Sequence, residues 1–266
     1  MRRFFAALAL TLAVTVTPGM AAGQIYIDGQ AASIDTTVEN NTTYVGLRQF
    51  VSHLRPDAAV TWEDGQAAVQ AVGLSITAVP GDLYLEANSR ALYAANGVQL
   101  KTGKTWVPVR ALSAALDAEV DWDAATGNIY ITTGSGAIQD GDAFYDPDAV
   151  YWLSRIISAE SRGEPMAGKI AVGNVVMNRV GHDDFPDTIY GVIFDDRWGG
   201  QFEPVRNGTI YAEPTEESVT AAKLVLEGAD VGLHSLYFLA PALTSDHWIM
   251  ENREHVMTIG LHWFYA

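Results

Sequence analysis

The segment Ser154-Arg-Ile-Ile-Ser-Ala-Glu-Ser-Arg-Gly-Glu-Pro165 places a carboxylate where a helix would ordinarily bury an apolar side chain. On a helical wheel that starts at Val150, the apolar residues between positions 153 and 157 fill an arc of about 240–340°, and Glu160 falls at about 280°. A carboxylate on the core face of a helix is costly to desolvate unless it is paired or protonated. A partly buried glutamate with a raised pKa is what a general acid requires at neutral pH, so the pattern makes Glu160 the first catalytic candidate.

The same geometry allows a structural interpretation of Glu160, as a helix-end glutamate that forms an ion pair with Arg155, Arg162 or Arg179. Glu164 lies four residues further along and could supply a second carboxylate. Because Glu164 precedes Pro165, its backbone is biased away from the helical conformation, and we expect it to fix a loop instead.

The first 22 residues are typical of a secretory signal peptide. Arg2 and Arg3 form a basic start, an apolar run follows from Phe4 to Val16, and small residues precede a cleavage site after Ala22. No other segment approaches the 18 consecutive apolar residues of a membrane span. We therefore expect a secreted, extracytoplasmic protein with no integral membrane span after signal cleavage.

Composition excludes several classes of function. The 266 residues carry a formal net charge of −16, which disfavours nucleic acid and anionic lipid as partners. The absence of cysteine excludes disulfides, thiolate catalysis and cysteine-based metal sites. None of the six histidines forms a known metal-ligand spacing and no Gly-x-Ser-x-Gly occurs, so we expect neither metal nor cofactor.

Residues 23–133 contain an internal repeat. Thr43-Tyr-Val-Gly-Leu-Arg48 returns as Thr105-Trp-Val-Pro-Val-Arg110, and each copy continues into a short apolar helix, expected over 50–54 and 112–116. A strand that carries Trp62 or Trp122 follows each helix. We expect these two tryptophans to pack in the core or a hairpin; the alternative is that they are platforms for stacking on sugars. The pattern predicts a small β-rich module.

The second half of the chain is expected to be mainly helical. A Gly- and Asp-rich stretch over 134–146 is typical of a linker, and the second domain is expected over 147–266. Capping residues and glycines predict helices from Asp146 to about Ser161, over 166–180, and from Thr215 through Leu226. Short strands are expected over 236–239 and 261–265.

Aromatic and amide residues gather downstream of Glu160, within segments 198–202, 237–238, 247–248 and 262–265. Carbohydrate clefts use aromatic rings to stack on sugar faces and amides to bond the hydroxyl and N-acetyl groups. The residues that we expect to bind sugar are Gln201, Phe202, Tyr237 and Tyr265.

Three ordered motifs carry a resemblance to a known family: Ile157-Ser-Ala-Glu-Ser-Arg-Gly-Glu-Pro165, Gly168-Lys-Ile-Ala-Val-Gly-Asn-Val-Val-Met-Asn-Arg179 and the terminal Ile259-Gly-Leu-His-Trp-Phe-Tyr265. From about residue 148 onward the chain resembles the SleB-type cell wall hydrolases, which include the spore-cortex-lytic enzymes. The repeat module resembles the N-terminal domain of copper amine oxidases, which implies a spacer or wall-interaction module without chemistry of its own.

The resemblance implies a fold class of α+β: a small β-rich repeat module followed by a mainly α, lysozyme-like catalytic domain. It also implies lytic transglycosylase action on peptidoglycan, with Glu160 in the place of the family's catalytic glutamate. In that reaction one carboxylate acts first as acid and then as base, which agrees with the lack of an obvious partner for Glu160.

Two other functions remain open from the sequence. A hydrolytic muramidase would need a second carboxylate, for which the candidates are Glu203, Asp183, Asp184, Asp195 and Asp196. A non-catalytic protein could instead hold glycan in an inert cleft. Oligomeric state cannot be predicted from these residues.

Overall fold

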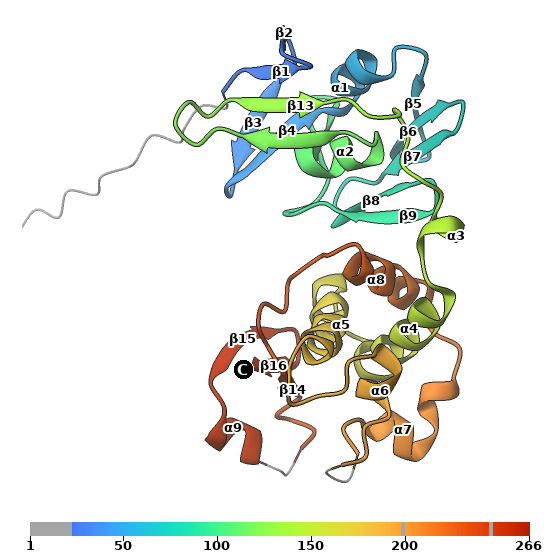
Figure 1. Ribbon diagram of the computed structural model, residues 1–266, viewed down its shortest axis with the longest axis vertical. Coiled ribbons are helices and arrows are strands. Elements are labelled where there is room, and N and C mark those ends of the chain that lie inside the picture. Colours follow the sequence, from blue (N-terminus) through green and yellow to red (C-terminus); the bar gives the residue numbers. More distant parts are fainter. Residues whose placement is uncertain (1–22, 198–199, 245–246) are drawn as a thin grey trace, which may run out of the picture.

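The chain folds into a β-rich N-terminal body and a mainly helical C-terminal body, joined by a short connection (Figure 1). The computed structural model describes residues 23–197, 200–244 and 247–266. The predicted α+β architecture is confirmed: strands dominate the first half, and the second half is helical with one small sheet. The predicted signal peptide lies outside the described residues.

The N-terminal body consists mainly of short strands. In chain order its elements are β1 (Ile25–Ile27), β2 (Gln30–Ala32), β3 (Thr36–Glu39), β4 (Thr42–Gly46), α1 (Leu47–Leu54), β5 (Ala59–Glu63), β6 (Gln66–Ala71), β7 (Leu74–Ala78), β8 (Tyr84–Ala87), β9 (Arg90–Tyr93), β10 (Gln99–Lys101), β11 (Lys104–Pro108), α2 (Val109–Ala115), β12 (Glu119–Trp122) and β13 (Ile129–Thr132). Within the described residues they form sheets in the orders β12-β13-β1-β2, β10-β11-β4-β3 and β5-β6-β7-β8-β9.

The sequence repeat is visible in this topology as two copies of a strand–helix–strand unit, β4–α1–β5 and β11–α2–β12. Strands β4 and β11 pair antiparallel, with Val45 opposite Val107, so the first strands of the two copies are neighbours in one sheet. Both helices begin three residues earlier than predicted, at Leu47 and Val109. The apolar residue and arginine that close each motif form the first helical turn, and both apolar side chains are buried.

The core of this body lies between its sheets and the two helices. Val45, Val107, Phe50 and Leu112 are fully buried there, and Ile138 from beyond the last strand packs with them. Trp62 and Trp122, expected in the core or a hairpin, are 46% and 52% exposed and lie in the β5–β6 and β12–β13 hairpins, outside the core. Both lie on edge strands of their sheets.

The C-terminal body is built around helix α5. Its elements are α4 (Pro147–Ser161), α5 (Met166–Val180), α6 (Ile189–Ile193), α7 (Glu203–Asn207), a 3-10 turn (Thr209–Tyr211), α8 (Glu216–Leu226), β14 (Tyr237–Leu239), α9 (Trp248–Asn252), β15 (His255–Ile259) and β16 (His262–Tyr265). Strands β14, β16 and β15 form an antiparallel sheet in that order. In the described part of the chain, no helix has both the length and the apolar character of a membrane span.

The helix boundaries follow the predicted capping residues. Asp146 accepts hydrogen bonds from the backbone N–H groups of Asp148 (2.8 Å) and Ala149 (3.3 Å), which fixes the start of α4. Thr215 caps α8 in the same way through the N–H of Ser218. Helix α5 packs against both α4 and α8, which also contact each other, and Gly173 allows its close approach: a Cβ there would lie 2.8 Å from a methyl group of Val225 and 2.9 Å from one of Ile157.

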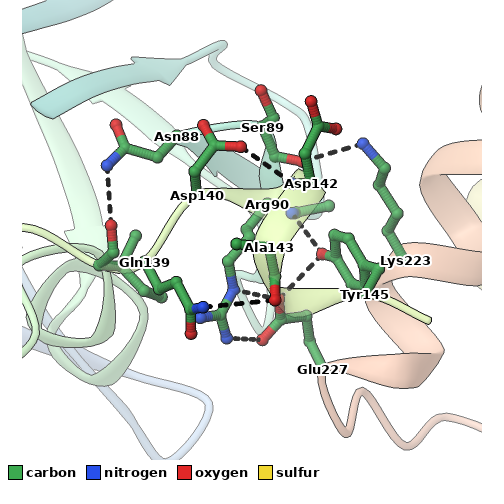
Figure 2. Close-up of polar contacts among 12 residues, drawn as sticks. Asn88, Ser89, Arg90, Gln139, Asp140, Asp142, Ala143, Tyr145, Lys223 and Glu227 are labelled. Atoms are coloured by element: carbon green, nitrogen blue, oxygen red, sulfur yellow. Dashed lines mark hydrogen bonds and ion pairs between the residues drawn. The ribbon is translucent and has the colours of Figure 1, made fainter. Parts of the chain in front are cut away.

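The two bodies contact each other through β9 and α8, where a buried ion pair joins them (Figure 2). The Arg90 guanidinium donates to both carboxylate oxygens of Glu227, at 2.6 Å each, and the Tyr145 hydroxyl donates to the same carboxylate at 2.8 Å. The side chains of Arg90 and Glu227 are 11% and 7% exposed. We call these three residues the interdomain clamp.

Residues 134–146, predicted as a linker, are folded against both bodies. They contain a short helix, α3 (Gly141–Phe144), and the Phe144 ring lies 3.4 Å from the centre of the Arg90 guanidinium. Ile138 is buried in the N-terminal core, whereas Tyr145 belongs to the clamp. The segment therefore holds the two bodies together as part of their interface.

Candidate active site

Glu160 lies in the last turn of α4, directly above the core of the C-terminal body. Ile156 and Ile157, one turn earlier, are fully buried, and Glu160 itself is half-buried. The Ser161 hydroxyl donates to the Ile157 carbonyl (2.6 Å), and the chain then turns at Gly163. The apolar face of the helix thus carries the carboxyl group to the edge of the core, as the helical wheel predicts.

Burial and a neighbouring carboxylate raise the pKa of Glu160 to about 7. The largest cause is desolvation, which disfavours the charged form, and the negative charge of Glu203 adds to it. The positive charge of Arg179 acts in the opposite direction. A carboxyl group with this pKa is about half protonated at neutral pH and can both give and accept a proton.

The structural ion pair considered for Glu160 is not formed within the described residues. Arg155 pairs instead with the carboxylate of Glu213 (3.2 Å), and Arg162 donates to the Glu213 carbonyl (3.2 Å). Arg179 influences Glu160 through its charge but forms no ion pair with it among these residues. The carboxyl group is therefore not neutralised by a structural partner.

Arg179, near the end of α5, is a buried cation with aromatic neighbours. Its Nε donates to the Leu236 carbonyl (2.7 Å), and one terminal nitrogen has no hydrogen-bond partner in the described part of the chain. The rings of Phe185, Phe202 and Tyr237 lie 4.9, 5.2 and 5.5 Å from its guanidinium carbon. Burial lowers the pKa of Arg179 to about 10, so the group remains charged at neutral pH.

The four predicted sugar-binding residues lie in different environments. Tyr237 on β14 is half-buried beside Arg179, and its hydroxyl accepts a hydrogen bond from Arg253 (3.0 Å). Gln201 is also half-buried. Phe202 and Tyr265 are 3% and 2% exposed, so their ring faces are covered by the protein and are not free to stack on a sugar.

Among the candidate second carboxylates, Glu203 is the one whose negative charge raises the pKa of Glu160. It is exposed at the start of α7, next to the buried Pro204. Asp195 is buried but already paired with Arg197 (2.8 Å), and this pairing lowers the pKa of Asp195. Asp183, Asp184 and Asp196 are exposed on the loops that flank α6.

Glu164 fixes a loop, as predicted. It is 8% exposed and accepts a hydrogen bond from the backbone N–H of Leu261 (3.1 Å), in the turn between β15 and β16. Gly260 in that turn has φ +56°, and a Cβ there would lie only 1.8 Å from the Glu164 carboxylate. The carboxylate therefore ties the small sheet to the loop between α4 and α5.

The part of the chain that the structure describes contains no cluster of three or more histidine and carboxylate side chains that could hold a metal ion. Trp198, which belongs to one predicted aromatic segment, lies outside the described residues. The charges of Glu203 and Arg179 act on the Glu160 carboxyl group, and Tyr237 lies beside Arg179.

Family models match both halves of the chain. Residues 163–265 match the model described as Cell Wall Hydrolase, and residues 26–131 match the Copper amine oxidase N-terminal domain. Glu160 stands three residues before the first match begins, so this match does not itself include the candidate acid.

Curated relatives include spore cortex-lytic enzymes. One from Oceanobacillus iheyensis is 30% identical over 148 residues, which cover 56% of this chain and 52% of the relative. One from Bacillus cereus is 35% identical over 120 residues, 45% of each chain. This chain thus spans about half the length of the curated relatives it matches. A solved structure, the catalytic domain of the germination-specific lytic transglycosylase SleB from Bacillus anthracis, is 33% identical, with 48% of this chain and 100% of that chain covered and a TM-score of 0.42.

Proposed function

We propose that this chain, whose C-terminal domain belongs to the cell wall hydrolase family, cleaves the glycan strands of peptidoglycan as a lytic transglycosylase. The observation that carries the proposal is the half-buried carboxyl group of Glu160, whose pKa is raised to about 7 with no ion-pair partner among the described residues. Such a group can act as an acid and then as a base in one catalytic cycle.

In the first step, Glu160 donates its proton to the oxygen that links N-acetylmuramic acid to N-acetylglucosamine. The bond between this oxygen and C1 of the muramic acid breaks, its electron pair stays on the oxygen, and C1 becomes oxocarbenium-like. In the second step, the Glu160 carboxylate removes the proton of the 6-hydroxyl group of the same sugar. That oxygen bonds to C1 and closes a 1,6-anhydro ring, which restores protonated Glu160 without consuming water.

Two further residues have roles in this reaction. The positive charge of Arg179 stabilises the Glu160 carboxylate that exists between the two steps. Tyr237, half-buried beside Arg179, and Gln201 are proposed to position the sugar. The buried side chains of Phe202, beside Arg179, and Tyr265, paired with Tyr237 in the sheet, would support these two residues.

A hydrolytic muramidase is the second candidate, because Glu203 is a second carboxylate whose negative charge raises the pKa of Glu160. In that reaction Glu203 would activate water or form the bond to C1, and the product would carry an ordinary reducing end. Reducing-end analysis of digested walls separates the two: we expect few new reducing ends per bond broken. A digest with one reducing end for each cleavage would replace the transglycosylase proposal with the hydrolytic one.

The site of action that fits this function is outside the cytoplasm, at the cell wall. Residues 1–22, with the pattern of a secretory signal, supply the means of export, and the net charge of −16 disfavours nucleic acid as a target. Loss of turbidity of purified walls distinguishes an enzyme from a wall-binding protein. Walls that keep their turbidity in the presence of the chain would favour the binding protein.

Substitution of Arg179 should change the pH dependence of wall lysis. Glu160 must be protonated to donate, so activity falls as the pH rises through its pKa of about 7. In Arg179→Met the charge that lowers this pKa is gone, so the pKa rises and the loss of activity moves to higher pH. Arg179→Lys keeps a positive charge and should shift the profile less.

The control for this shift is Arg162→Met, which removes an exposed arginine whose hydrogen bond goes to the Glu213 carbonyl. Thermal unfolding confirms that each variant is folded at the assay temperature. A profile for Arg179→Met that is unchanged, or displaced to lower pH, would contradict the role assigned to this charge.

A further inference from the structure

A groove of about 430 Å³ opens in the N-terminal body, between the edge strand β5 and the β10–β11 hairpin. The first turn of α1 also lines it. The side chains that matter for its chemistry are those of Trp62, Leu100, Arg48, Gln49 and Lys104. None of them belongs to the candidate active site, and neither the catalytic proposal nor the packing of the core accounts for them.

Two large apolar side chains of this groove are open to solvent. Trp62 is 46% exposed and Leu100 is 50% exposed, although their neighbours Leu47 and Ala67 are almost fully buried. An exposed ring beside polar groups is typical of surfaces that stack on sugars, because a pyranose has one apolar face and a rim of hydroxyl groups. Gln49 provides an amide at this rim, and its oxygen is fixed by the backbone N–H of Asp35 (3.0 Å).

The charge at the groove is positive in a chain whose net charge is −16. Arg48 is exposed and has no hydrogen bond or ion pair with any residue that the structure describes. Lys104 is nearby and pairs with Asp35. A ligand that offers a sugar face to Trp62 and a carboxylate to Arg48 would therefore complement both features of the groove.

We propose that this groove is a second binding site for the glycan strand, which holds an acidic sugar unit by stacking on Trp62 and by an ion pair with Arg48. This inference rests on the proposed function, since the peptidoglycan strand that Glu160 would cleave carries carboxylates at its muramic acid units: on the lactyl group where no peptide is attached, and on the attached peptide elsewhere. The site would bind substrate without chemistry and would keep the chain on the wall between cleavage events.

The position of the groove suits a second site. Strand β5 forms one edge of the five-stranded sheet, and β9 at the opposite edge contacts α8 of the C-terminal body. Four strand spacings of about 4.8 Å place the groove roughly 19 Å beyond this contact. The interdomain clamp joins the two bodies at β9. A glycan strand bound in the groove would therefore be kept at a fixed distance from the C-terminal body (Figure 1).

The repeat provides a matched control within the same body. Trp122 occupies the equivalent position in the second copy and is 52% exposed, but it does not line this groove. Arg110 is the counterpart of Arg48, and its guanidinium donates to the Val120 carbonyl at 3.4 Å. Substitutions at Trp122 and Arg110 therefore remove the same side chains from the surface and leave the groove unchanged.

The test is co-sedimentation of the full chain with purified insoluble peptidoglycan. All variants carry Glu160→Gln so that the walls remain intact. We expect Trp62→Ala and Arg48→Gln each to weaken binding about tenfold, and Trp122→Ala and Arg110→Gln to change it less than about twofold. Thermal unfolding verifies that the four variants remain folded, which their exposed positions favour.

Two results would overturn the inference: binding of Trp62→Ala that equals that of the parent, or an equal loss in the Trp122→Ala control. The proposed catalytic function is tested separately, with chains that carry Glu160. The groove proposal fails alone if Trp62→Ala in the Glu160→Gln chain binds walls as well as the parent, while Trp62→Ala in the chain with Glu160 intact still releases sugar. If the unsubstituted chain releases no sugar, the catalytic proposal fails, whatever the binding result.

Discussion

Glu160→Gln should reduce cleavage of peptidoglycan by about 100- to 10,000-fold, the range typical for loss of a general acid. The amide has nearly the same shape but cannot donate a proton to the glycosidic oxygen or remove one from the 6-hydroxyl group. Since burial makes the charged form of Glu160 costly, the substitution should leave the free energy of unfolding unchanged or slightly increased. The measurement is sugar release from purified walls, together with thermal unfolding.

Glu203→Gln is the matched control, because it removes the other carboxylate that influences this site. We expect this variant to remain active. The pKa of Glu160 should fall when the negative charge of Glu203 is removed, so the loss of activity with rising pH should move to lower pH. A loss in Glu203→Gln as large as that in Glu160→Gln would indicate a two-carboxylate hydrolytic mechanism instead. Full activity in Glu160→Gln would place the acid elsewhere.

Glu227→Ala should destabilise the chain by about 3–5 kcal/mol, because it leaves the Arg90 guanidinium without its partner at a buried position. Both carboxylate oxygens accept from Arg90, and one also accepts from Tyr145, so three hydrogen bonds are lost together. The apolar contact between β9 and α8 remains, with Ala91 buried in the C-terminal core. We expect the melting temperature to fall by roughly 10 °C and the two bodies to unfold in separate transitions.

The control for the clamp is Glu39→Ala, which removes the carboxylate of the Lys101–Glu39 ion pair. Its side chains are 45% and 36% exposed, so the expected cost is below about 1 kcal/mol. Calorimetry of both variants measures the difference. Equal, small effects of Glu227→Ala and Glu39→Ala would mean that the clamp does not couple the two bodies.

The main elements of the fold could be predicted from sequence because their signals are local. The caps at Asp146 and Thr215, and the glycines that follow α5 and α8, mark helix ends within a few residues. Elements α6, α7 and β15 are each five residues long, which is too short to show a helical or strand periodicity in the sequence. The clamp could not be foreseen either, because Arg90 and Glu227 are 137 residues apart.

The candidate site was predictable only in part. Glu160 is identified by its place on an apolar helix face, which is a property of neighbouring residues. Arg179 also belongs to a recognisable helix, but its role depends on rings from the loop before α6, from the residue before α7 and from β14, which meet only in three dimensions. Composition cannot separate exposed from buried rings, which is why the burial of Phe202, expected to bind sugar, could not be predicted from the sequence.

The most direct test of the central claim is mass spectrometry of glycan fragments after digestion in water enriched in ¹⁸O. If Glu160 returns as the base, O6 of the muramic acid closes on C1, so the fragments end in an anhydro sugar, lighter by one water, and carry no ¹⁸O. The same digest with Glu160→Gln should contain no such fragments. Fragments with an ordinary reducing end that contains ¹⁸O would contradict the proposed transglycosylase mechanism.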